Sequence, residues 1–87
     1  MEPHVVVALL KHVPRLFEAA HVTTFKCYRQ SADGRTQEVT VEILDRGLGD
    51  SPRYSCVARS DDGKAASGNS ADRIDVVLST LHWEDLD

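Results

Sequence analysis

Tyr54-Ser-Cys-Val-Ala-Arg-Ser60 runs into Asp61-Asp62-Gly63, and Lys64 to Ser67 then leads to Gly68-Asn69-Ser70. Alternation in the first run is typical of a strand, and Asp-Asp-Gly is typical of a tight turn. Residues 64–67 can add a short fourth strand, and Asn69 or Ser70 can cap a following helix. The segment therefore indicates an α+β domain.

The stretch from Ala71 to Trp83 has the period of an amphipathic helix. Asp72 and Asp75 near its start suit the positive end of a helix dipole. Its apolar stripe consists of Ile74, Val77, Leu78 and Leu81. We therefore expect a final helix that buries this stripe against a sheet.

Two further strands precede this segment. Val22 to Gln30 is rich in β-branched and aromatic residues and ends at the turn sequence Ser31-Ala-Asp-Gly34. Thr36 to Arg46 alternates, with Val39, Val41 and Ile43 on one face. If the turns set the register, Cys27 pairs near Val39 and Cys56 near Ile43, which keeps the two thiols beyond disulfide reach.

The N-terminal stretch from Pro3 to Ala20 also has apolar residues at helical spacing. Pro14 interrupts it, because proline cannot donate the hydrogen bond to the carbonyl of Leu10. The apolar stripe keeps its phase across Pro14, so we prefer one kinked helix to two separate helices. This stripe consists of Val6, Leu9, Leu10, Val13, Phe17 and Ala20.

These elements predict an α+β fold in a single domain spanning residues 1–87. The order is a helix, an antiparallel meander of three or four strands and a second helix. Both helices are expected on one sheet face, on the side of Val39, because this buries both stripes and one sheet face together. The other sheet face is then left to solvent or to a partner.

Composition narrows the classes of function. The 87 residues include 14 acidic and 10 basic side chains, and the formal net charge is −4. A net negative charge disfavours tight electrostatic binding to nucleic acid or to an anionic membrane. The apolar run from Val5 to Leu10 is too short to span a bilayer, and Glu2 and His4 precede it where a leader would carry basic residues. We expect a cytoplasmic protein with two reduced thiols.

The run Asp62-Gly-Lys-Ala-Ala-Ser-Gly-Asn-Ser70 resembles the last strand and helix start of double-stranded-RNA-binding domains. That resemblance implies an α-β-β-β-α fold. In the family, lysines at the helix start grip phosphates, whereas Ala71, Asp72 and Asp75 stand at the matching lysine positions here. Carboxylates there would repel the phosphates. The same run is similar to the strand-to-helix joint of HicB-type antitoxins.

Candidate catalytic residues are few. His12 and His21 are nine residues apart, which places them out of phase on a helix. No carboxylate stands at ligand spacing from a histidine, so we expect surface histidines and no metal or other cofactor. Core packing is the expected role of Cys27 and Cys56. We therefore expect a protein that is not an enzyme.

The open sheet face is the candidate interface. It is expected to combine basic, acidic, aromatic and aliphatic side chains. Both a solvated face and a subunit interface are compatible with this mixture. A surface that binds nucleic acid would need more aromatic residues and fewer acids. Trp83 either seals the end of the core or, with Leu86, anchors a partner. The candidate residues are Lys26, Tyr28, Thr40, Glu42, Leu44, Val57, Arg59 and Trp83.

The preferred hypothesis is a small non-catalytic interaction module that forms a homodimer through its open sheet face or binds another protein there. The alternative is a nucleic-acid-associated regulator that keeps the double-stranded-RNA-binding fold and uses Lys26, Arg53 and Arg59 in place of the missing lysines. The alternative requires that these three cations are free to bind phosphate, and the preferred hypothesis does not.

Overall fold

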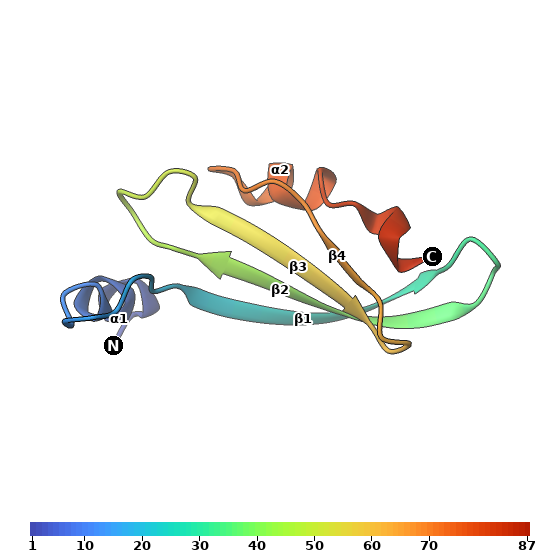
Figure 1. Cartoon of the computed structure of the whole chain (residues 1–87), viewed down its shortest axis with the longest axis horizontal. Coiled ribbons are helices and arrows are strands. Elements are labelled where there is room, and N and C mark those ends of the chain that lie inside the picture. Colours follow the sequence, from blue (N-terminus) through green and yellow to red (C-terminus); the bar gives the residue numbers. More distant parts are fainter.

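The computed structural model describes residues 1–87 and shows an α+β domain built on one antiparallel sheet (Figure 1). The sheet has the order β1-β2-β3-β4, so each strand pairs with its neighbour in the chain. This confirms the predicted fold class and element order, and it decides between the three and four strands left open by the sequence in favour of four. The elements are α1 (Pro3–Leu10), β1 (His21–Gln30), β2 (Thr36–Asp45), β3 (Tyr54–Ser60), β4 (Ala65–Ser67), α2 (Ile74–Ser79) and the 3-10 helix η1 (Trp83–Leu86).

The predicted register is also confirmed. Cys27 pairs with Val39 and Cys56 with Ile43. Both thiols are free, and they belong to strands separated by β2. Two related turns join β1 to β2 and β3 to β4, whereas a longer loop over residues 46–53 joins β2 to β3. Gly34 and Gly63 have φ values of +84° and +89°, a conformation that glycine adopts without strain.

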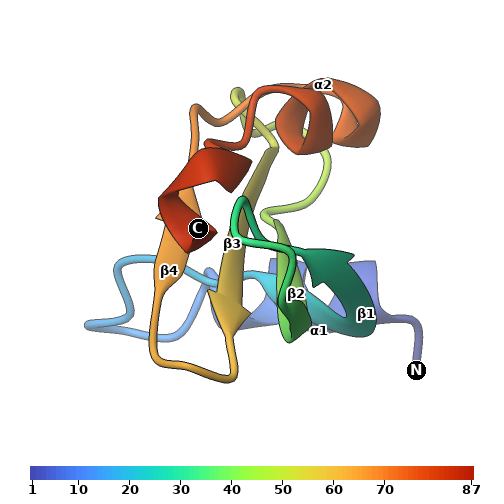
Figure 2. The same ribbon diagram turned by 90° about the vertical axis from the view of Figure 1, so that its right-hand side faces the viewer.

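The core lies between the sheet and the C-terminal helices (Figure 2). The predicted docking of Val77 and Leu81 onto the Val39 side is confirmed, with Leu78 packed against the same cluster. Ile74, in contrast, stays 41% exposed. The nine buried residues of the core are Val39, Val41, Ile43, Cys56, Ala58, Ala66, Val77, Leu81 and Leu86.

The C-terminal helix begins later than predicted. Ala71 is held in a β-bridge, because it exchanges both backbone hydrogen bonds with Tyr54, at 2.8 and 3.0 Å. Asp72 accepts hydrogen bonds from the Arg53 N–H and the Ser51 hydroxyl instead of serving the helix dipole. The helix therefore starts at Ile74, and neither Asn69 nor Ser70 caps it.

The N-terminal helix is shorter than predicted, and it does not lie on the sheet face where it was expected. The prediction of a single kinked helix over residues 3–20 was wrong: α1 ends at Leu10, and no helix forms between Pro14 and the start of β1 at His21. Arg15 adopts a φ of +73°, which turns the chain away from a helical path. The resulting α1 lies beyond the end of the sheet, beside the start of β1 (Figure 1), rather than over the face that α2 covers.

Contacts to the β2–β3 loop hold α1 at that end. Val7 is its one buried residue, and a methyl group placed on Gly47 would lie 3.6 Å from Val7 Cγ1. Lys11 Nζ donates to the Arg46 carbonyl at 2.5 Å and to Asp50 Oδ2 at 2.7 Å. Because these partners belong to the loop, α1 is positioned by that loop and not by the face of the sheet.

Candidate functional site

The open sheet face carries seven of the eight predicted interface residues. Strand pairing places Lys26, Thr40 and Arg59 in one row across the sheet, and Glu42 beside Val57 in the next. Tyr28 is 71% exposed, whereas Leu44 and Val57 are half-buried. The structure thus brings these residues together on one face.

Ion pairs within this face neutralise most of its charge. Lys26 Nζ lies 2.9 Å from Glu38 Oε1, and Arg59 is paired with Glu42. The shallow hollow between them is lined by Lys26, Glu38, Thr40, Glu42, Arg59, Ser60 and Asp61, none of them hydrophobic. This ion-paired part of the face is well solvated and has little apolar area to bury, whereas Tyr28 and Val22 are exposed elsewhere on the same face.

Arg53, the third predicted cation, is also engaged. Its guanidinium forms a bidentate pair with Asp45, at 2.7 and 3.0 Å, and stacks 4.9 Å from the centre of the Tyr54 ring. The hydrogen bond from Arg53 holds the pKa of Asp45 below its ordinary value. Arg73, at the start of α2, is likewise paired, with Asp75 at 2.9 Å.

An apolar groove lies on the opposite side of the sheet, between β1 and the C-terminal helices. We call it the β1–α2 groove. It encloses about 540 Å³, and seven of its eight lining residues are hydrophobic. Its lining consists of Thr23, Phe25, Cys27, Val41, Ile43, Ile74, Leu78 and Trp83.

The groove exists because one short helix cannot cover four strands. Strands lie roughly 4.8 Å apart, so four of them span about 14 Å, whereas a helix is about 10 Å wide. Val77 of α2 packs into the core with residues of β2, β3 and β4. The edge strand β1 therefore has no helix above it. Phe25 on this strand is 52% exposed.

Trp83 forms the C-terminal wall of the groove. Its indole N–H donates to the Leu78 carbonyl at 3.0 Å, and its half-buried ring packs against the core. The predicted sealing of the core by Trp83 agrees with this packing, and the ring also lines the groove. The predicted anchor of Trp83 with Leu86 was wrong, because Leu86 is fully buried in the core and cannot reach a partner.

A buried polar network fixes η1 to the far end of the sheet. Gln37 is 1% exposed and donates to the Leu86 carbonyl at 2.6 Å. Its own carbonyl accepts from Arg29, which also lies 2.9 Å from Asp87. Gln37 and Phe25 were missed in the sequence. Both share a face with Val39 by strand alternation, and that signal could have revealed them.

Two aspartates stabilise the hairpin turns. The Ser31 hydroxyl bonds to Asp33 and lowers the pKa of that carboxyl to about 2. The Ser60 hydroxyl does the same for Asp62, whose pKa is also about 2. Both carboxyls belong to turns that set strand register, and we assign them a structural role.

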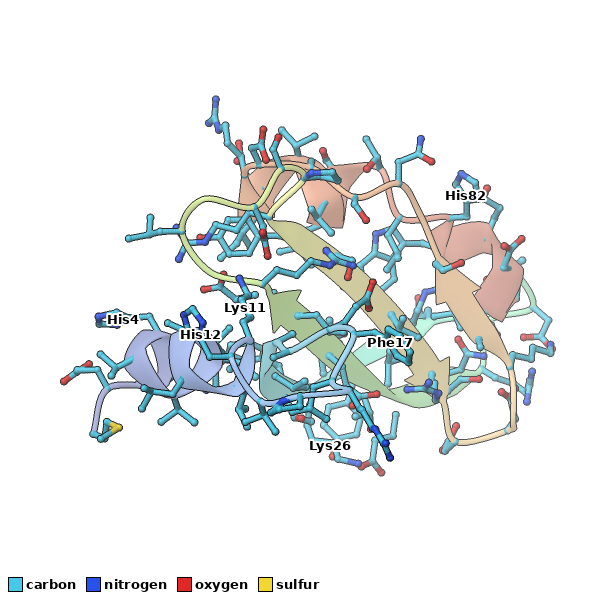
Figure 3. The ribbon with its side chains drawn as sticks, turned by 60° about the vertical axis from the view of Figure 1, so that its left-hand side comes forward. His4, Lys11, His12, Phe17, Lys26 and His82 are labelled. Carbon is cyan, nitrogen blue, oxygen red and sulfur yellow. The ribbon has the colours of Figure 1, made fainter.

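The histidines and cysteines lie apart. His4 is on α1, His12 lies in the turn just after it, and His82 is beside η1 at the other end of the molecule (Figure 3). No group of three or more His, Cys, Asp or Glu side chains is placed to hold a metal ion. Burial raises the pKa of the Cys56 thiol, which disfavours the reactive thiolate. None of the helices has the length and apolar character needed to cross a bilayer.

Comparisons of the chain with protein-family models, with curated proteins and with solved structures give no match.

Proposed function

We propose that this chain is a non-catalytic interaction module that self-associates through the face carrying the β1–α2 groove. The exposure of Phe25 on the groove floor is the observation that supports this most directly. Each Å² of apolar surface removed from water contributes roughly 25 cal/mol, so a partner that covers this floor gains affinity. Contiguous apolar surface rimmed by polar residues is typical of protein interfaces.

The groove face suits self-association better than the open face expected from the sequence. On the open face the charged side chains already form ion pairs with one another, Lys26 with Glu38 and Arg59 with Glu42. A partner placed there would have to desolvate those pairs, which costs free energy. The groove presents no such pairs, because its one polar lining residue is Thr23.

The position of β1 adds a second reason. This ten-residue strand pairs only with β2, so its other edge has unpaired backbone N–H and C=O groups. A long unpaired edge favours contact with another chain. Because Phe25 lies on the same strand, the apolar floor and the free edge form one continuous surface.

Two exposed aromatic residues of β1 provide a matched test. Phe25 lies on the groove face and Tyr28 on the open face, at 52% and 71% exposure. We expect the wild-type chain to dimerise at high micromolar concentration in sedimentation equilibrium. Phe25→Ser should weaken dimerisation about tenfold or more, the effect of losing roughly 1.4 kcal/mol. Tyr28→Ser should leave it unchanged.

Two other outcomes would contradict dimerisation through the groove face. A wild-type chain that remains monomeric at every concentration contradicts self-association. Loss of dimerisation in Tyr28→Ser, with Phe25→Ser unaffected, returns the interface to the open sheet face. Circular dichroism of both variants controls for folding.

A further inference from the structure

The outward side of α1 is apolar and largely exposed, with Val6 and Leu10 also lining a hollow beside Ala20, His21 and Val22 of the same chain. A helix advances about 100° per residue, so Val5, Val6, Leu9 and Leu10 fall within an arc of roughly 140°. All four are exposed, with Leu9 at 55%. Only Val7, outside that arc, is buried against its own chain. An apolar arc of this width is typical of a helix that packs against another surface.

The contacts of α1 keep this arc away from its own groove. Val7 packs at Gly47, and Lys11 bonds to Arg46 and Asp50 of the β2–β3 loop. For α1 to reach the groove of the same chain, all of these contacts would have to break. A second copy can receive the arc without breaking them.

The groove matches α1 in length. Eight residues of helix span about 12 Å. The groove floor on β1 runs from Thr23 to Cys27, four strand steps or about 13 Å. The outward arc consists of aliphatic side chains, and the groove is lined by aliphatic and aromatic ones.

Charge complements the apolar match. Residues 3–15, which contain α1 and the following turn, include Lys11 and Arg15 and no acid. Lys11 is paired with Asp50, so Arg15 is the cation left for a partner. Residues 71–87, which contain α2 and η1 beside the groove, include Arg73 as the one base. The acids in that second segment are Asp72, Asp75, Glu84, Asp85 and Asp87, of which Glu84 and Asp85 form no ion pair or hydrogen bond through their side chains within the chain. Opposite charge on two surfaces favours their approach and fixes their orientation.

We infer that α1 of one copy occupies the β1–α2 groove of a second copy, and that the contact is reciprocal; this inference rests on the proposed self-association. A two-fold axis makes both helix-in-groove contacts identical. Two such contacts bury twice the area of one, which brings the interface toward the roughly 1,200–2,000 Å² of stable complexes.

Substitutions on the two sides of this contact test it in the full-length chain. Leu9→Gln removes the most exposed apolar residue of α1 and keeps a good helix former. Phe25→Ser removes the groove floor. Each variant should weaken dimerisation about tenfold or more in sedimentation equilibrium. Val76→Gln is the matched control, because Val76 is an exposed helical residue that does not line the groove.

The decisive measurement is whether a mixture of the two variants forms heterodimers. Leu9→Gln keeps an intact groove and Phe25→Ser keeps an intact α1, so a mixed dimer retains one complete helix-in-groove contact. We expect the mixture to form heterodimers where each variant alone is monomeric. Contacts of groove with groove or of helix with helix would give no such recovery.

Several results would overturn the inference. If Phe25→Ser dissociates the dimer and Leu9→Gln does not, self-association through the groove stands and the occupant is not α1. The same holds if the mixed variants remain monomeric. A wild-type monomer in which Leu9→Gln shifts the NMR signals of Phe25 would show α1 folded onto its own groove.

Discussion

Gln37 shows how a single polar residue holds two distant parts of the chain together. It lies on β2 with Val39 and Val41, yet its amide N–H donates to the Leu86 carbonyl at 2.6 Å. Its carbonyl accepts from Arg29 at 2.8 Å. A buried amide with both ends satisfied fixes the orientation of its partners, here η1 on the sheet.

Replacing Gln37 should therefore destabilise the protein. Gln37→Leu keeps the volume and leaves the Leu86 carbonyl without a partner, so we expect a loss of about 1–3 kcal/mol in the free energy of unfolding. Urea denaturation followed by circular dichroism measures it. Gln30→Leu, on the exposed end of β1, is the control and should be nearly neutral. Equal stability of the two variants would remove the structural role assigned to Gln37.

At the scale of elements, both helices are shorter than their apolar periodicity predicts. α1 ends at Leu10 because Pro14 offers no N–H to continue it and Arg15 turns the chain. α2 starts at Ile74 because Ala71 is paired with Tyr54. Apolar periodicity indicates which face of a segment would be buried if the segment were helical. Backbone hydrogen bonds to other segments decide where the helix can begin.

Gly68 permits the close approach of β4 to the segment that follows α2. A Cβ added there would lie 2.8 Å from the Thr80 carbonyl oxygen and 3.1 Å from Leu81 Cα. Both neighbours are backbone atoms, so relief requires a shift of the chain. We expect Gly68→Ala to lower the free energy of unfolding by about 1–3 kcal/mol.

Asn69→Ala is the comparison for Gly68→Ala. Asn69 is exposed and forms no capping hydrogen bond with α2, so its replacement should leave stability unchanged. Thermal unfolding of both variants distinguishes them. A loss in Asn69→Ala of about 1 kcal/mol, the usual effect of removing a helix cap, would show that the predicted cap operates in solution.

For the whole molecule, the core and the N-terminal helix are nearly independent. The dimensions are 47 × 22 × 20 Å, and α1 occupies one end of the long axis (Figure 1). Every residue of the nine-member core lies between Val39 and Leu86. The sheet with its C-terminal helices is thus the folding unit. The helix α1 lies outside this unit and is free to contact a second copy of the chain.

Removal of residues 1–20 tests that division. We expect residues 21–87 to keep the sheet, with a loss of about 1.5–3 kcal/mol, the value of burying one valine. Urea unfolding and amide hydrogen exchange measure stability and sheet protection. Val7→Ala in the full chain should account for much of the same loss. Non-cooperative unfolding of residues 21–87 would instead place α1 inside the folding unit.

The sequence by itself determined the strands, their order and their register. Alternation of Val39, Val41 and Ile43 identifies the buried face, and the Asp-Gly turns define the pairing of β1 with β2 and of β3 with β4. These signals are local, so they can be read along the chain. They also placed Val77 and Leu81 on the core side.

Only the tertiary structure decided where α1 lies and which face is left apolar. The position of α1 depends on Val7 meeting Gly47 and on Lys11 reaching Asp50, contacts between segments almost forty residues apart. The β1–α2 groove depends on how much of the sheet one short helix covers. Neither follows from local periodicity, because the same apolar stripe can be buried against its own sheet or left uncovered.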